Sequence, residues 1–514
     1  MHVYRRLSPL SSRQWHIVVA ALLVTNGACT PTGERDEALT VAAAIEDETR
    51  DQAETPPERS PARSASSSRS PVTAAAAAAT PDESPAEPWT RVVWTRDLGD
   101  GTDYVSLGNQ LVLMAYDSHD GQGERTLLKR RAGYAKPMIT PSGAEVIYSL
   151  RARKTVHVIR WDGSKRRRIA DGFALAVWAD PETGDEWVYV GVDPSTGTNP
   201  SYPSIYRHRL GKQKRELVWD TQPVSGNGFQ LSADGRYAGG LFPWPHAGIA
   251  DLVAGTWKEL GEGCWTAIAQ DGKNLCWYFD GLHRNLNLVD IDTDDRWQVG
   301  INGAPGINGF EVYHPRWTNS SRYLVTTGPY TVGRRDNKIR GGGKQVEVWL
   351  GRFSSDFSSV EHWRQITDND FADFYPDAWV DPSHIAPEDP PGRPLTLAAS
   401  DTTASVRLVV DVRVRQDSPV PTPQSIAPYK HGLQALEYDV IEVLEGTYDE
   451  SILVAAHWVI LDEAVLDGAA RPVASTHRLT VERYDTHPEL EGQRLIMDSN
   501  AFTLPLYYDV EGVP

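Results

Sequence analysis

The sequence predicts an all-β protein, with a ring of repeated four-stranded antiparallel sheets followed by a smaller β domain. The first observation is residues 264–299, which hold four short apolar runs separated by turns, with Asp271-Gly272 at the first turn. The second is that similar units of about 40 to 60 residues, a repeat length typical of ring-forming sheets, recur from Trp89 to Val380. The third is that no amphipathic helical pattern interrupts them. A single four-stranded sheet is marginally stable alone, so the units must bury their faces against each other.

Each unit opens with a strand that ends in a turn of small or polar residues. Asp-Gly and Ser-Gly pairs tolerate the positive φ that a two-strand connection needs. Segments of this kind are residues 139–148, 231–238, 268–275 and 317–325. A later strand runs into a second turn in residues 156–163, 205–211, 249–255, 286–292 and 346–353. The repeats predict a six-bladed β-propeller, with seven blades as the alternative.

These turns resemble the repeats of TolB-type β-propellers. In that family a Ser-x-Asp-Gly turn precedes an apolar strand, as at Ser232–Gly235, and a later strand runs into an Asp-x-Asp turn, as at Asp290–Asp292. The resemblance spans residues 90–380 and departs at Ser142-Gly143 and in the third unit, where Asp180–Gly184 rebuilds the first turn. It implies the propeller fold and gives no information on the ligand.

The end of the repeat region predicts how the ring closes. Residues 371–380 have the pattern of one more inner strand, which would close the ring beside the first blade and remove exposed sheet edges. Residues 381–394 are rich in proline and predict a linker. Residues 395–514 predict a compact β-sandwich or barrel domain, and the segment from Tyr438 to Gly446 resembles small barrels of the OB or netrin-like kind.

The first 29 residues have the parts of a secretion signal. A basic start is followed by the apolar run Ile17–Val24, which is too short to span a bilayer. The ending resembles a bacterial lipoprotein box, which implies that Cys29 becomes the lipidated first residue. It departs from the box at Asn26, where the family usually has Leu or Val, and Thr30 implies sorting to the outer membrane. The alternative is ordinary cleavage that releases a secreted protein.

Composition and net charge limit the class of binding partner. Residues 30–88 are rich in Ala, Ser, Thr, Pro and Glu and predict a disordered tether between the lipid anchor and the propeller. The net charge of −18 argues against nucleic acid, whose phosphates require a basic surface. We therefore expect an envelope protein or peptide as the partner, or a glycan, with membrane attachment only through the lipid.

The two remaining cysteines suggest a disulfide. Cys264 and Cys276 flank a turn centred near Gln270-Asp271, so a regular hairpin would place them nearly opposite each other. An exported protein can form such a bond. The alternative is two small buried thiols in a hydrophobic core.

No catalytic residue, cofactor or metal site is predicted. The sequence has no G-x-S-x-G elbow, no H-E-x-x-H and no C-x-x-C-H. The acidic cluster Asp290–Asp295 lacks the later glycine and distant glutamate of a calcium loop, so a solvated hairpin is the better interpretation.

Propeller ligands usually meet inner strands and loops at one mouth of the central channel, which is an argument by analogy with the fold. Residues 313–317 are the richest segment, with an imidazole, a guanidinium and aromatic rings close together. We expect a binding or scaffolding module. The alternative is a polysaccharide-acting lyase or hydrolase with a metal in the channel. The predicted ligand-binding residues are Lys136, Asn227, His246, Trp265, His283, His314, Arg316, Asp377 and Trp379.

Overall fold

The computed structural model describes residues 88–99, 106–196, 200–212, 214–330, 343–384, 407–427, 429–490, 492–497, 499, 501 and 504–512. The predicted signal with Cys29, the tether up to residue 87 and the linker beyond His384 lie outside the described residues. Within the described part of the chain, no helix has the length and apolar character needed to cross a membrane.

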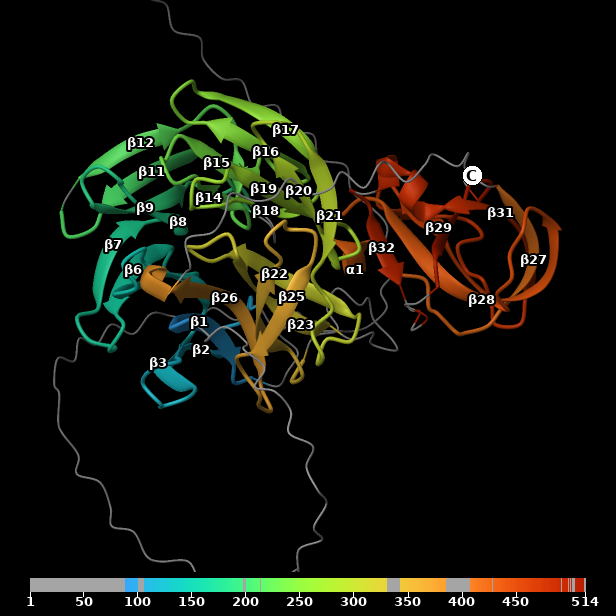
Figure 1. The fold of residues 1–514 in the computed structure, drawn as a ribbon, viewed down its shortest axis with the longest axis horizontal. Helices are drawn as coiled ribbons and strands as arrows, with labels where there is room; N and C mark the ends of the chain where they lie inside the picture. Colours follow the sequence, from blue (N-terminus) through green and yellow to red (C-terminus); the bar gives the residue numbers. More distant parts are fainter. Residues whose placement is uncertain are drawn as a thin grey trace, which may run out of the picture. The chain divides into compact units, whose positions relative to one another are not determined.

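Six four-stranded antiparallel sheets form the propeller within the described residues, which confirms the first of the two predicted blade counts (Figure 1). From the innermost strand outward, blade 1 is β26 (Ala372–Val380), β1 (Thr90–Asp97), β2 (Leu111–Asp117) and β3 (Arg125–Ala132), and blade 2 is β4 (Tyr134–Ile139), β5 (Glu145–Leu150), β6 (Thr155–Arg160) and β7 (Arg167–Asp171). Blade 3 is β8 (Phe173–Ala179), β9 (Glu186–Val192), β11 (Ser204–Arg209) and β12 (Arg215–Trp219), and blade 4 is β14 (Phe229–Leu231), β15 (Tyr237–Leu241), β16 (His246–Asp251) and β17 (Thr256–Glu262). Blade 5 is β18 (Cys264–Ile268), β19 (Leu275–Phe279), β20 (Asn285–Asp290) and β21 (Arg296–Gly300), and blade 6 is β22 (Glu311–Trp317), β23 (Tyr323–Tyr330), β24 (Glu347–Phe353) and β25 (Val360–Gln365). A short pair, β10 (Ser201–Tyr202) with β13 (Val224–Ser225), precedes blade 4.

The ring is closed by a strand from the far end of the propeller sequence. β26 pairs antiparallel with β1, with Arg91 opposite Trp379 and Asp97 opposite Ala372. The prediction of a closing inner strand is confirmed, and that strand belongs to the first blade itself. Because closure pairs the inner edge of β1, this edge is not left open to other chains.

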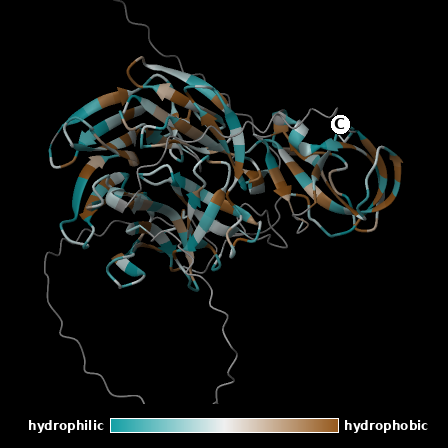
Figure 2. Cartoon of the chain, viewed as in Figure 1, coloured by the Kyte–Doolittle hydropathy of each residue, from teal (hydrophilic) through white to brown (hydrophobic). Residues whose placement is uncertain are grey.

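Hydrophobic faces of neighbouring blades pack against each other. Trp277 of β19 and Trp317 of β22 are both buried, and their rings stack with centroids 3.9 Å apart between blades 5 and 6. Hydrophobic stretches recur along the strands of the propeller and of the C-terminal domain (Figure 2). Burial of a large apolar side chain contributes about 1.5–3 kcal/mol, so these interblade contacts stabilise the ring.

The C-terminal domain is a small barrel, which confirms the predicted β domain. Its sheet runs β30-β29-β33-β31-β27-β28-β32, and an additional β29–β28 pairing closes it. The barrel core includes Val410, Val412, Leu436, Leu453 and Leu479. The strands are β27 (Leu408–Val414), β28 (Gly432–Glu445), β29 (Ile452–Leu461), β30 (Ala464–Val465), β31 (Thr476–Arg483), β32 (Arg494–Met497) and β33 (Leu506–Asp509). The helical turns are η2 (Pro382–His384) in the linker, and α1 (Pro423–Ile426), η3 (Tyr484–Thr486) and η4 (Pro488–Leu490) in the barrel.

The predicted disulfide is wrong, because both cysteines are free thiols. The β18–β19 pairing shifts register between Cys264 and Ala267, so Cys264 lies opposite Phe279 and Cys276 lies opposite Ile268. The two thiols pack into different cores, Cys264 toward blade 6 and Cys276 toward blade 4. They fit the alternative interpretation of two small buried hydrophobic side chains.

Candidate functional site

The innermost strands carry a repeated backbone irregularity near the channel. Lys136, Trp265, His314 and Tyr375 have φ of +43°, +42°, +57° and +48°, values that residues other than glycine rarely adopt. In each case the pairing of the inner strand shifts register at or beside this residue, as in a β-bulge. Strained backbone of this kind is held in place by the surrounding fold and clusters at functional sites.

The side chains of the four bulge residues and of Asn227, which precedes β14, meet at the channel. Two adjoining cavities lie there, a small central one and a larger one next to it. Both are lined by Lys136, Trp265, Tyr375 and Asn227. His314 lines the central cavity, and its ring lies 4.0 Å from that of Tyr375, centroid to centroid. Three of the bulges share a sequence feature, since Lys136, His314 and Tyr375 each precede a proline. We call the set of Lys136, Asn227, Trp265, His314 and Tyr375 the channel ring.

A cavity of about 140 Å³ lies on the side of the channel ring where the inner strands begin. We call it the mouth cavity. Its walls are mostly aromatic and aliphatic, with Phe173, Tyr202 and Trp244 beside the ring residues. Leu107, which is 42% exposed, lies at its rim. The cavity can therefore take an apolar group from solvent.

Tyr429 of the C-terminal domain closes one side of the mouth cavity. Its hydroxyl lies 3.0 Å from Cys264 Sγ and 3.0 Å from His283 Nε2, and its ring meets Trp244 edge-on at 4.9 Å. The Tyr429 side chain is buried. Both domains thus build this wall, and neither domain alone completes the cavity.

A buried ion pair fixes the C-terminal domain at this position. Arg494 of β32 is fully buried, and its Nη2 donates to both carboxylate oxygens of Glu311 at 2.9 and 3.1 Å. Its Nη1 also donates to the Gly281 carbonyl at 3.0 Å. Burial favours a raised pKa for Glu311, but the Arg494 guanidinium and His283 hold it below its ordinary value. A paired carboxylate is the form that this contact requires.

His283 is neutral in this environment. Burial lowers its pKa to about 4, and the Glu311 carboxylate only partly offsets that effect. Its Nε2 lies next to the Tyr429 hydroxyl, and its Nδ1 is 3.5 Å from Glu311 Oε2. The imidazole therefore acts as a hydrogen-bonding group behind the Tyr429 wall.

The charged groups of the mouth cavity have one sign. Lys136 and Arg151 line it, and no carboxylate is among its described lining residues. Lys136 Nζ donates to the Gly226 carbonyl at 3.0 Å, and Arg151 Nη2 donates to the Ser106 carbonyl at 3.0 Å. Burial, with Arg316 nearby, holds the pKa of Lys136 well below its ordinary value.

The far end of the channel, where the inner strands finish, is closely packed. Arg316 Nε and Asp377 Oδ1 form an ion pair at 2.6 Å, and Asp377 Oδ2 accepts from the Ile139 backbone N–H at 2.6 Å. Trp379 donates from Nε1 to the Pro141 carbonyl at 2.9 Å. The remaining cavity there measures about 20 Å³. These three predicted residues join blades 6, 1 and 2 and leave room for little more than a water molecule.

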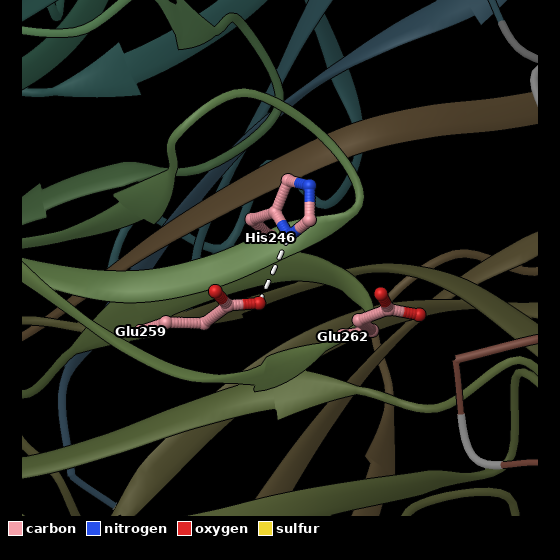
Figure 3. Close-up of side chains that lie close together, drawn as sticks. All are labelled: His246, Glu259 and Glu262. Carbon is pink, nitrogen blue, oxygen red and sulfur yellow. Dashed lines mark hydrogen bonds and ion pairs between the residues drawn. The ribbon is translucent and has the colours of Figure 1, made fainter. Parts of the chain in front are cut away.

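His246 lies on the outer hairpin of blade 4 and does not line the cavities of the channel. Figure 3 shows it beside Glu259 and Glu262. It is paired with Glu262 across β16 and β17, and a register shift beside Gly248 brings Glu259 to the same face. His246 Nδ1 is 2.8 Å from Glu259 Oε1, and ligand atoms of all three side chains lie within 4.8 Å of one another. Imidazole and carboxylates of this kind could hold a divalent cation. It is the one such group within the described residues.

The structure thus separates the nine predicted ligand residues into four places. Lys136, Asn227, Trp265 and His314 meet in the channel ring, and His283 supports the wall of the mouth cavity. The far end holds Arg316, Asp377 and Trp379, and the outer hairpin of blade 4 holds His246. Sequence reasoning missed Arg151, Tyr202, Trp244, Tyr375 and Tyr429.

One missed residue had a signal in the sequence. Tyr375-Pro376 repeats the pattern of Lys136-Pro137 and His314-Pro315 at the same place in the blade. Tyr429 had none, because its position depends on how the C-terminal domain packs.

Comparison with known proteins finds structural similarity but no sequence match. No family model and no curated protein sequence matches the chain. The structure is similar to TolB from Acinetobacter baumannii, with 16% identity over 56% of this chain and 66% of that one, just under two thirds of its length, and a TM-score of 0.38. A putative TolB from Agrobacterium tumefaciens matches at 11% identity, over 57% of this chain and 99% of that one, with a TM-score of 0.35.

The fold itself is a six-bladed β-propeller with a separate C-terminal β domain within the described residues. A structure of a nidogen/laminin complex is also similar, with 16% identity over 36% of this chain and 70% of that one and a TM-score of 0.29. This propeller differs from a bare ring in one respect that matters for the site, since its barrel supplies Tyr429 to the mouth cavity.

Proposed function

We propose that this TolB-like propeller is a binding module of the bacterial cell envelope, and that its mouth cavity holds one residue-sized group of a partner protein or peptide. The observation that carries the proposal is the size and lining of the cavity. Its volume of about 140 Å³ is close to that of an engineered cavity of about 150 Å³ that binds benzene. Clefts that bury whole small molecules measure about 300–1,000 Å³. A single side chain or chain end fits the smaller space.

The size of the cavity also favours a peptide over a glycan. A chain of several sugar units needs an extended groove, whereas this cavity of about 140 Å³, walled by Phe173, Trp244 and Trp265, has room for one group. Aromatic rings contribute large contact area at low entropic cost, which suits a protein partner.

The envelope location rests on the sequence. The basic start and the apolar run Ile17–Val24 direct export, and the box that ends at Cys29 supports a lipid anchor at the outer membrane. The tether of residues 30–88 would then allow the propeller to reach partners away from the membrane surface. Release as a secreted protein is the alternative. Mass spectrometry of the mature N-terminus separates the two, because diacylglycerol on Cys29 adds a defined mass.

Site-specific photo-crosslinking tests the binding proposal. A photoreactive residue replaces Leu107 at the rim of the mouth cavity in the full-length protein in cells, and the matched control replaces Val253, which is 81% exposed on the β16–β17 turn. We expect one partner peptide, identified by mass spectrometry, to join at position 107 and not at 253.

A cavity-filling variant completes the test. Ala174 lines the cavity and is buried, so Ala174→Leu reduces the free volume without adding charge. We expect the adduct at position 107 to disappear in this variant while its thermal unfolding stays cooperative. Equal crosslinking at both positions, or an adduct that persists in the filled cavity, would contradict the proposal.

A further inference from the structure

We propose that the group held in the mouth cavity carries a carboxylate attached to a ring-sized apolar body, such as an aromatic residue at the end of a peptide chain. This inference rests on the proposed function and names the chemistry of its ligand. It is carried by the distribution of charge and of hydrogen-bonding groups around the cavity.

The two cations of the cavity lack a carboxylate partner inside it. Lys136 and Arg151 come from β4 and from the turn after β5, and their described hydrogen bonds go to backbone carbonyls. Neutral carbonyls stabilise a buried cation less than a carboxylate does. Since no described lining residue is acidic, an incoming carboxylate would be the first full counter-charge in the cavity.

Two buried carboxylates beside the cavity already have strong partners. Asp377 pairs with Arg316 below the channel ring and only partly offsets the lowered pKa of Lys136, and Glu311 pairs with Arg494 behind His283. Neither carboxylate lines the mouth cavity. The described carboxylates on both sides of the cavity are therefore engaged, and a carboxylate that entered the cavity would favour the charged form of Lys136.

Polar atoms at the cavity are also available to an acceptor. Arg151 Nε is buried and has no hydrogen-bond partner among the described residues, and the same holds for the Tyr313 hydroxyl. A buried donor without a partner costs free energy that a ligand oxygen can recover. A carboxylate has two oxygens and can accept from a guanidinium with good geometry.

The walls specify the rest of the ligand. Phe173, Tyr202, Trp244 and Trp265 surround the space beside the two cations, so the group next to the carboxylate must be apolar. An aromatic ring packs well against edges and faces of other rings. The cavity of about 140 Å³ leaves room for one such ring.

Three peptides of matched size test the inference with the full-length wild-type protein. The first ends in phenylalanine with a free carboxylate, the second is its C-terminal amide, and the third has an internal aspartate with an amidated end. Calorimetry or tryptophan fluorescence reports binding, since Trp244 and Trp265 line the cavity. We expect the amide to bind at least about tenfold more weakly than the acid, the loss typical of a hydrogen bond to a charged group.

The third peptide distinguishes the source of the carboxylate. If it binds as well as the free acid, an acidic side chain supplies the group, and the carboxylate inference still holds. Equal binding of acid and amide overturns the inference but leaves the proposed binding function in place. If none of the three binds, the carboxylate inference also fails, and crosslinking at position 107 decides the proposed function separately.

A charge variant provides a second readout. Lys136→Met removes one cation but keeps a long apolar side chain, and the matched control Lys258→Met removes an exposed lysine of β17. We expect the acid-over-amide preference to fall severalfold in Lys136→Met and to stay unchanged in Lys258→Met. An unchanged preference in Lys136→Met, with wild-type thermal unfolding, would contradict the inference.

Discussion

At the far end of the channel, Arg316 faces Asp377 at 2.6 Å in a space of about 20 Å³, whereas at the mouth Lys136 and Arg151 face a cavity of about 140 Å³ without a described carboxylate. Both ends are built by the same inner strands, a few residues apart. The difference lies in which charges have partners. A charge paired with a carboxylate holds blades together, and a basic side chain without a carboxylate in its cavity is available to a ligand.

The two ends of the channel show that some of the predicted ligand residues hold blades together and others border the mouth cavity. The predicted ligand residues Arg316, Asp377 and Trp379 are engaged with each other or with neighbouring blades. Lys136 and Trp265 lie earlier on their inner strands, at the bulge position of blades 2 and 5, and they border the mouth cavity.

The largest expected effect is on stability at the far end. Asp377→Ala leaves Arg316 buried without its partner and removes the acceptor of the Ile139 N–H. Breaking a buried ion pair costs about 3–5 kcal/mol, so we expect the free energy of unfolding in urea to fall by this amount. Asp171→Ala, at an exposed ion pair with Arg168, is the control and should leave stability nearly unchanged. A loss in Asp377→Ala no larger than in the control would refute the structural role.

The second-largest expected effect is a loss of folding stability at low pH. Burial lowers the pKa of His314 to about 3 in the folded protein, against about 6.5 in the unfolded chain. The unfolded state therefore takes up the proton first, so the contribution of His314 is fully present above pH 6.5 and is lost as the pH falls toward 3. Each pKa unit corresponds to about 1.4 kcal/mol. We expect a loss of about 2–3 kcal/mol at pH 4.5 from this residue.

The variant His314→Gln isolates that contribution. The amide can still bond to Thr327 Oγ1, which lies 3.0 Å from His314 Nδ1, but it does not titrate. Unfolding in urea at several pH values should show a smaller decline between pH 6.5 and 4.5 in the variant than in the wild type. Parallel curves for the two proteins would mean that His314 is not buried in its neutral form.

A smaller effect is expected at the mouth. Tyr429→Phe removes the hydroxyl next to Cys264 and His283 but keeps the ring against Trp244. The lost hydrogen bond should cost about 1 kcal/mol, measured as a lower thermal midpoint. The matched control is Tyr313→Phe, because the Tyr313 hydroxyl is buried without a partner among the described residues and should cost nothing. Equal losses in the two variants would exclude a specific role for the Tyr429 hydroxyl.

No effect of metal removal on the mouth is expected. His246, Glu259 and Glu262 lie on the outer hairpin of blade 4, and none of them lines the mouth cavity. Peptide binding by the full chain should therefore be the same after treatment with EDTA and after addition of zinc. Binding that vanishes with the chelator would place a cation in the cavity and would favour the metal-dependent alternative.

The fold was predictable because its signals are local. Turn residues such as Asp271-Gly272 specify hairpins within a few positions, and repetition of the hairpins specifies the ring. Residues 371–380 were also recognisable as a closing strand by their resemblance to other inner strands.

The site was less predictable because it depends on irregularities and on distant contacts. A regular hairpin would oppose Cys264 and Cys276, but the bulge beside Trp265 shifts the pairing and separates them. Tyr429 reaches the mouth only because Arg494 anchors the barrel to Glu311, a contact between residues 183 positions apart. No local pattern encodes a contact of that range.

The closing strand has a consequence for biosynthesis. β26 is the last propeller strand to leave the ribosome, and β1 is the first. At about 5–20 residues per second, the inner edge of β1 waits roughly 15–60 s for its partner. During that time its unpaired backbone groups are open to neighbouring nascent chains. Arg91, Arg96 and Asp97 place charges along this strand, which discourages such pairing until residue 380 has been made.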